Sequence, residues 1–259
     1  MNKKFCLVFS LLIFSPIMGI CKDAKTPIGI VEKLGNQIPA DVELYDENGN
    51  LQTLGRLIDK PTIIDLVYFR CTALCDPLLN EVVKVVDKMD LEMGKDYQIL
   101  TVSFDQNEKP ETASGKRDNY LGQVKKTVDP NGWRFLTGDS LNIYRLTNSV
   151  GFYFQRSGED WVHPTALIAV SPDRKITRYL YGIYPLPLDV KLAIMEASEG
   201  RTGPAIAKVL NICYTYDSEG KHYTFNFVRV AGIVIAGLTM LFVFVFIVKP
   251  KKEKKRNKR

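Results

Sequence analysis

Two apolar runs, one near each end, limit what this chain of 259 residues can fold into. The first runs from Phe5 to Ile20 behind Lys3 and Lys4, a layout typical of a secretory signal peptide. The second, Val230 to Val248, is nineteen residues without a charge, and a helix of that length would cross about 28 Å of bilayer. The roughly two hundred residues between the two runs are enough for one domain.

The basic residues that follow the second run predict a topology. The tail from Lys249 to Arg259 carries eight Lys or Arg against Glu253 alone, and the rest of the chain is close to neutral. A basic flank of this kind stays in the cytoplasm. We therefore expect a signal peptide over 1–21, an extracytoplasmic domain over 22–229, a single transmembrane helix over 230–248 and a cytoplasmic tail over 249–259. The protein would sit in the cytoplasmic membrane with its domain on the periplasmic side.

Short apolar segments alternate with helical patterns in the body of the chain. Buried strands are expected over Thr62–Phe69, Gln98–Phe104, Trp133–Leu136 and Thr165–Val170. Apolar residues recur at helical spacing over Leu78–Met89, Leu141–Val150 and Leu188–Ala197. This alternation predicts an α/β fold with a mainly parallel central sheet. No basic cluster interleaved with aromatic residues lies in the body, which argues against nucleic-acid binding.

Two hairpins are expected beside that core. Ile176–Tyr181 follows a turn and would pair with Thr165–Val170 as an antiparallel edge. Val42–Leu51, which contains the turn-forming Asp46-Glu47-Asn48-Gly49, predicts an extra N-terminal hairpin. The polar segment Asp105–Arg117 contains Pro and Gly and is interpreted as a loop.

Three of the five cysteines, Cys71, Cys75 and Cys213, belong to the body of the chain. A fourth lies inside the signal peptide, and Cys21 lies at its end. Because the bulky Ile20 precedes Cys21, plain cleavage is favoured over a lipidated cysteine.

Cys71 and Cys75 lie where the first predicted strand meets a helix, which we expect to start near Asp76 or Pro77. Residues four apart in the first turn of a helix share a face, so the two sulfurs can approach each other. The positive end of the helix and the neighbouring Arg70 both favour thiolates there.

Such a pair could form a structural disulfide, cycle between dithiol and disulfide, or bind a soft metal. The structural bridge is disfavoured, because it would close only a very short loop and constrain the unfolded chain little. The C-x-x-x-C spacing alone leaves the other two functions open.

His163 favours the metal. It is one of two histidines, and it directly precedes Pro164 and a predicted strand. Loops at one end of an α/β sheet converge, so His163 is expected near the cysteines. Two thiolates and one imidazole suit copper(I) and can also hold copper(II), whereas zinc prefers a fourth ligand that is not evident. The sequence thus predicts a copper site formed by Cys71, Cys75 and His163.

Further motifs carry a resemblance to a known family. They are Tyr68–Cys75 (YFRCTALC), Val102–Asp105 (VSFD), His163 with the Ser171-Pro172-Asp173 turn, Arg178–Gly182 (RYLYG), Glu196–Gly200 (EASEG) and Asn211–Asp217 (NICYTYD). At these residues the chain resembles the Sco/SenC proteins, exported thioredoxin-fold copper chaperones that help to assemble the copper centre of cytochrome oxidase. The resemblance covers nearly all of the exported region, and with the C-terminal span it is similar to a bacterial branch anchored at that end.

The resemblance implies a thioredoxin-like fold, metal ligands at Cys71, Cys75 and His163, and a copper-accepting oxidase subunit as partner. It also has departures. Members of the family often have Pro directly after a ligand cysteine, where this chain has Thr72 and Asp76. Pro164 resembles the cis-proline that faces the redox pair in ordinary thioredoxins, so whether it is cis stays open. A membrane-anchored thiol-disulfide oxidoreductase, with Cys71 and Cys75 as its redox pair, is therefore the alternative function.

Three other residues are assigned lesser roles. His222 lies in a polar juxtamembrane turn and is interpreted as a solvated residue. Cys213 has no evident partner and is interpreted as a small buried apolar residue. Asp105, at the end of a strand, could shape the loop beside the site.

Overall fold

The computed structural model describes residues 28–71, 73–203, 214–217, 222–225 and 227–243. The predicted signal peptide, the basic tail, Cys21 and Cys213 lie outside the described residues, so those predictions stay predictions.

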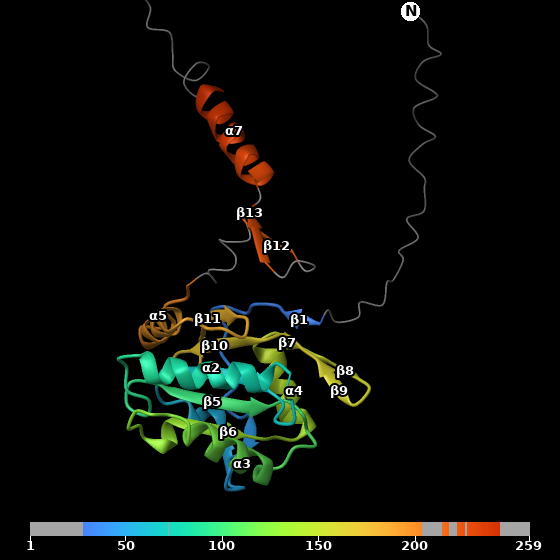
Figure 1. The fold of residues 1–259 in the computed structure, drawn as a ribbon, viewed down its shortest axis with the longest axis vertical. Coiled ribbons are helices and arrows are strands. Elements are labelled where there is room, and N and C mark those ends of the chain that lie inside the picture. The colour runs from blue at the N-terminus through green and yellow to red at the C-terminus, as the bar shows by residue number, and fades with distance from the viewer. Residues whose placement is uncertain (1–27, 72, 204–213, 218–221, 226, 244–259) are drawn as a thin grey trace, which may run out of the picture.

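A five-stranded sheet forms the centre of the fold (Figure 1). Its strands, in spatial order, are β11 (Ile176–Tyr181), β10 (Ala166–Val170), β4 (Thr62–Val67), β5 (Gln98–Ser103) and β6 (Trp133–Leu136). Every residue of β4, β5 and β10 is buried, as expected of apolar strands that are covered on both faces. The five predicted strands are therefore confirmed, with ends that differ by at most two residues.

The sheet is more mixed than the sequence predicted. β4, β5 and β6 are parallel, and the hairpin of β10 with β11 is antiparallel as expected. However, β10 also runs antiparallel to β4. The prediction of a mainly parallel sheet is therefore wrong for the half that contains β10 and β11. The chain enters β10 at the end of the sheet where β4 finishes, so β10 runs in the opposite direction to β4.

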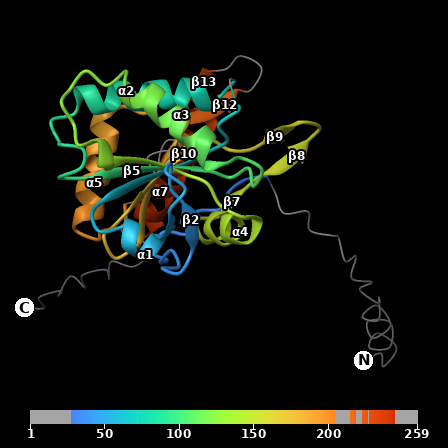
Figure 2. The same cartoon turned by 90° about the horizontal axis from the view of Figure 1, so that it is seen from below.

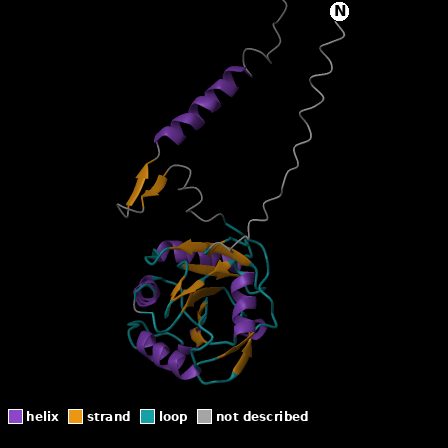
Figure 3. Cartoon of the chain, turned by 90° about the vertical axis from the view of Figure 1, so that its right-hand side faces the viewer, coloured by secondary structure: helices purple, strands orange, loops and turns teal. Residues whose placement is uncertain are grey.

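Helices cover both faces of the sheet (Figures 2 and 3). The three predicted helices are confirmed as α2 (Cys75–Lys88), α4 (Ser140–Ser149) and α5 (Pro187–Ser198). α2 contacts both α5 and α3 (Pro110–Leu121) on one face, whereas α4 lies on the other. The predicted N-terminal hairpin is confirmed as β2 (Glu43–Tyr45) with β3 (Leu51–Thr53), which leads into the short α1 (Leu54–Leu57).

Helix α3 corrects the prediction of a loop over 105–117. Its residues are mostly polar, and only Ala113 and Tyr120 are buried. The sequence therefore shows no apolar stripe at helical spacing from which this helix could be predicted. The helix is held by tertiary contacts instead. The Tyr120 ring stacks on Phe135 of β6 with a centroid distance of 6.3 Å, and its hydroxyl donates to Asp76 Oδ1 at 2.8 Å. Pro110 at the first position suits a helix start.

Several short elements were not predicted: β1 (Gly29–Ile30) paired with β7 (Phe152–Tyr153), β8 (Gln155–Ser157) paired with β9 (Asp160–Val162), and a 3-10 turn over Pro130–Gly132. The hairpin of β8 and β9 matters most, because its second strand leads directly to His163.

The described C-terminal part consists of β12 (Tyr214–Asp217), β13 (His222–Phe225) and α7 (Phe227–Val243). α7 overlaps the predicted transmembrane helix, of which residues 244–248 lie outside the described part. Within the residues that the structure describes, no helix has the combined length and apolarity needed to cross a membrane.

Candidate metal centre

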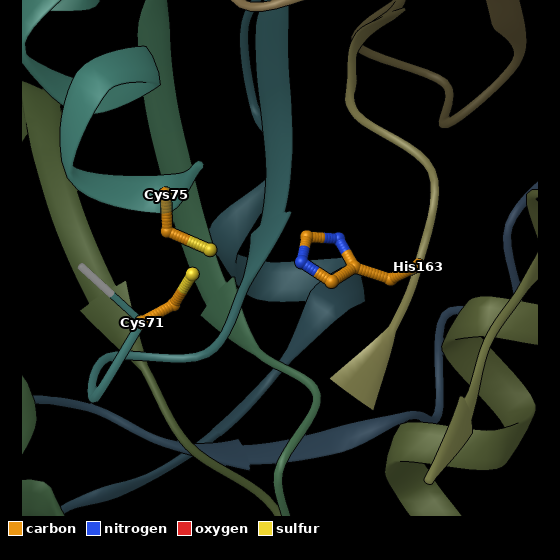
Figure 4. A group of neighbouring side chains, drawn as sticks. All are labelled: Cys71, Cys75 and His163. Atoms are coloured by element: carbon orange, nitrogen blue, oxygen red, sulfur yellow. The ribbon is translucent and has the colours of Figure 1, made fainter. Parts of the chain in front are cut away.

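The three predicted ligands come together at one edge of the central sheet (Figure 4). Cys71 lies in the loop after β4, Cys75 is the first residue of α2, and His163 lies between β9 and β10. The Cys71 and Cys75 sulfurs point toward each other, with the His163 ring facing them from the other side. One ligand atom from each residue lies within 4.8 Å of the others. Among the described residues no second group of three such side chains is found.

Strand direction explains why His163 arrives there. β10 runs antiparallel to β4, with Leu167 opposite Asp65. The start of β10 therefore lies beside the end of β4, and the residue three places before β10 reaches the loop that follows β4. The convergence predicted for His163 is confirmed, but it depends on an antiparallel pairing that the sequence analysis did not predict.

The two cysteines meet through a turn rather than within a helix. α2 begins at Cys75, one residue before the predicted start near Asp76, so Cys71 lies outside the helix and a shared helical face does not explain how the two sulfurs approach. The loop curls back instead: the Cys71 amide donates to Tyr68 O at 3.1 Å, and the Leu74 amide points at Cys71 Sγ at 3.5 Å. Both cysteines are free thiols, and both are buried.

The surroundings make the two thiols unequal. Burial raises the pKa of Cys71, but hydrogen bonds from the Leu74 and Cys75 amides and from the Tyr68 hydroxyl outweigh it, and the pKa falls below its ordinary value. Burial raises the pKa of Cys75 far above its ordinary value, and the negative charges of Cys71 and Asp65 add to the rise. Burial also raises the pKa of Asp65 to about 8. Cys71 is thus the more acidic thiol of the pair.

His163 is oriented as a neutral ligand. Its Nδ1 lies 2.8 Å from Pro164 O, and because a carbonyl only accepts, Nδ1 carries the proton and Nε2 keeps its lone pair. A metal-binding histidine usually has such a partner for its other nitrogen. The ring packs against Phe104 at 5.1 Å and edge-on against Tyr68 at 5.7 Å. Burial lowers the pKa of His163, despite the bond to Pro164.

This donor set fits a soft metal ion. Two sulfurs and one imidazole nitrogen suit three-coordinate copper(I). A closed zinc site would take a fourth ligand, and within the described part of the chain the group contains no further His, Cys, Asp or Glu. The arrangement could also support dithiol chemistry, because a more acidic Cys71 faces a more buried Cys75.

The remaining predicted residues are placed as follows. Asp105 lies at the end of β5 close to the site, where it contacts Arg70 and Trp161. His222 begins β13. None of the peptide bonds in the described residues is cis, so the bond before Pro164, which the sequence left open, is trans and differs in this from the cis-proline of ordinary thioredoxins. Sequence reasoning gave no role to Tyr68 or Trp161, since nothing in the sequence shows which aromatic residues fold against a site.

Comparison with known proteins identifies the family. The model of the SCO1/SenC family matches residues 32–186, more than half of the chain. The chain belongs to the SCO1/SenC family. No match was found among curated proteins. The resemblance to the Sco/SenC family is therefore confirmed, whereas the likeness to a branch anchored at the C-terminus stays a prediction.

Solved structures show the same fold. A candidate electron transfer protein from Aquifex aeolicus VF5 is 29% identical, with a TM-score of 0.59 over 64% of this chain and 95% of its own. Arabidopsis thaliana ScoI, solved with copper bound, is 18% identical, with a TM-score of 0.51 over 61% of this chain and 99% of its own. BsSco is described as a member of the Sco family of cytochrome c oxidase assembly proteins. It is 18% identical, with a TM-score of 0.50 over 66% of this chain and 96% of its own.

The unequal thiols of this SCO1/SenC protein predict unequal alkylation. The thiolate is the nucleophile in alkylation. In the full-length protein, the alkylation rate of Cys71 should therefore reach half its maximum at a pH below the ordinary cysteine pKa. The alkylation rate of Cys75 should do so only at a pH well above that value. The measurement is the pH dependence of iodoacetamide labelling at each residue, resolved by peptide mass spectrometry. In urea the two profiles should merge, and coincident profiles in the folded protein would contradict the assignment.

Proposed function

We propose that Cys71, Cys75 and His163 hold one copper ion and that the protein delivers this copper to a subunit of cytochrome c oxidase. The observation that carries the proposal is the approach of two free sulfurs and one neutral imidazole to within 4.8 Å of one another in a SCO1/SenC chain. Three-coordinate copper(I) matches this set, and the same ligands can retain copper(II). The protein then acts as a metallochaperone rather than as an enzyme.

The partner follows from the family. BsSco is described as belonging to a family of cytochrome c oxidase assembly proteins, and Arabidopsis ScoI was solved with copper bound. Both have the fold of this chain. A copper-accepting oxidase subunit is the corresponding partner here.

We further infer that the domain lies outside the cytoplasmic membrane, exported by the signal peptide over 1–21 and anchored by 230–248 with the basic tail inside. Support comes from the eight basic residues of the tail and from apolar side chains that α7 leaves exposed, among them Ile235, Leu238 and Met240. Exposed apolar surface on a helix requires an apolar partner such as lipid.

A thiol-disulfide oxidoreductase is the second candidate, and the unequal thiols favour it. In that function the Cys71 thiolate would attack one sulfur of a partner disulfide and release the other as a thiolate. Cys75 would then resolve the mixed disulfide, so that the partner is reduced and Cys71–Cys75 is oxidised. The two functions differ in what they require of His163, because dithiol exchange needs no imidazole ligand.

Substitution His163→Ala separates the two functions. It should weaken copper(II) binding by more than about tenfold, since even outer-shell partners contribute that much, and copper(I) binding less, because two thiolates still hold that ion. Formation of the Cys71–Cys75 disulfide should persist. His222→Ala, which removes the other histidine, is the control and should bind copper as the wild type does. Normal copper binding with loss of disulfide-reducing activity in His163→Ala would favour the oxidoreductase.

The role proposed for His163 also predicts that copper affinity depends on pH. Protonation of His163 removes a ligand, so wild-type copper affinity should fall as the pH decreases. Because burial lowers the pKa of His163, the fall should begin below the ordinary histidine value of about 6.5. Copper titrations at graded pH should show this component in the wild type and not in His163→Ala.

The proposed topology predicts protease accessibility. In intact spheroplasts, added protease should digest the domain and spare an epitope tag placed after Arg259. Cleavage of that tag from outside would reverse the proposed orientation.

A further inference from the structure

One buried carboxylate joins the two loops that carry the proposed ligands. Asp105 follows β5 and is 1% exposed. Its Oδ2 accepts hydrogen bonds from Arg70 Nη2 at 2.7 Å and from Trp161 Nε1 at 3.3 Å. Arg70 directly precedes Cys71, and Trp161 lies two residues before His163. A single oxygen atom thus connects the cysteine loop to the histidine loop.

The carboxylate is itself firmly held. Oδ1 accepts from the backbone amide and the side chain of Asn107 at 3.0 and 2.9 Å. Burial raises the pKa of Asp105, but its hydrogen bonds from Asn107, Arg70 and Trp161 outweigh that effect and hold the pKa below its usual range. The group is therefore ionised at neutral pH, with four donors arranged around two oxygens.

The neighbouring Glu108 has a narrower role. Its carboxylate accepts from the Phe69 and Arg70 amides at 2.7 and 2.9 Å and from Ser103 Oγ at 2.6 Å. These bonds fix the backbone before Cys71 without reaching the histidine loop. A second hydrogen bond between the two loops, donated by the Tyr68 hydroxyl to Asp160 Oδ1, is longer at 3.4 Å.

We propose that Asp105 is a positioning residue that sets the distance between His163 and the cysteine pair. The inference rests on the copper function proposed above. Copper(I) can be held by two sulfurs, whereas copper(II) depends on the imidazole as well. Loss of the Asp105 bridge should therefore release the histidine loop and weaken copper(II) binding selectively.

Asp105→Asn disrupts the hydrogen bonds of this carboxylate with little change of shape, and it removes the negative charge that pairs with Arg70. Asparagine offers one acceptor oxygen and an NH2 group. It cannot accept both from Asn107 and from the pair of Arg70 and Trp161, so at least one of these two sets of donors faces the NH2 group. Trp161→Phe removes only the indole N–H and keeps a ring in place. Asp46→Asn is the matched control. Asp46 is also a buried turn aspartate, 2% exposed, that accepts from the Asn48 and Asn50 amides and pairs with Arg134 at 2.9 Å, but it lies in the β2–β3 hairpin.

The test compares these variants as full-length proteins in detergent. Copper(I) and copper(II) affinities are measured by competition, and the nitrogen hyperfine coupling of bound copper(II) by electron paramagnetic resonance. Asp105→Asn and Trp161→Phe should each weaken copper(II) by about tenfold or more, the range of outer-shell partners, with a smaller change for copper(I) and a weakened nitrogen coupling. The double variant should lose little more copper(II) affinity than the more affected single variant, because both substitutions act on the same connection between the two loops.

Three results would overturn the proposal: wild-type copper(II) affinity and nitrogen coupling in Asp105→Asn, an equal effect of Asp46→Asn, or additive losses in the double variant. If Asp105→Asn fails to fold, Trp161→Phe alone decides by the same criteria. Absence of copper binding in the wild type would instead contradict the proposed function itself, so the two failures are distinguishable.

Discussion

Burial of β4 on both faces is the constraint on which the rest of the structure depends. All six of its residues are buried between β10 and β5. β5 pairs with β4 in parallel, so the two strands end at the same edge of the sheet. β10 pairs with β4 in the antiparallel direction, so it begins at that edge. One edge of the sheet thus receives the cysteine loop from β4, Asp105 from β5 and His163 from the approach to β10. The proposed ligands are far apart in the sequence, and strand order and direction bring them together.

Burial also sets the chemistry of this edge. The same low-polarity surroundings raise the pKa of Cys75 and of Asp65 and lower the pKa of His163, because burial disfavours whichever form carries charge. Cys71 and Asp105 depart from this rule, because the hydrogen bonds that each receives outweigh burial and lower its pKa. The site therefore combines a neutral imidazole with one thiol of lowered pKa, Cys71, and one thiol of raised pKa, Cys75. A soft cation would have to displace the thiol protons, so the proposed copper binding and the alternative dithiol chemistry both depend on how readily the two thiols ionise.

The sequence predicted the buried half of the fold better than the exposed half. Apolar runs found β4, β5, β6, β10 and β11, and helical spacing found α2, α4 and α5, because burial leaves a pattern in the sequence. α3 was missed since Tyr120 and Asp76 hold it through contacts distant in sequence, and β8–β9 because its residues are largely exposed. In the site, the chemistry of cysteine and histidine identified the three candidate ligands. Asp105 and Trp161 could not be assigned in the same way, because their roles depend on which loops meet.

The central claim is that copper is held by two sulfurs and one imidazole nitrogen. Copper K-edge X-ray absorption on the full-length protein loaded with one equivalent of copper(I) tests it most directly, because the scattering shells distinguish sulfur from nitrogen and multiple scattering identifies imidazole. The account predicts three-coordinate copper with two sulfurs and one histidine nitrogen. A spectrum with two sulfurs alone, or one dominated by nitrogen and oxygen ligands, would contradict it.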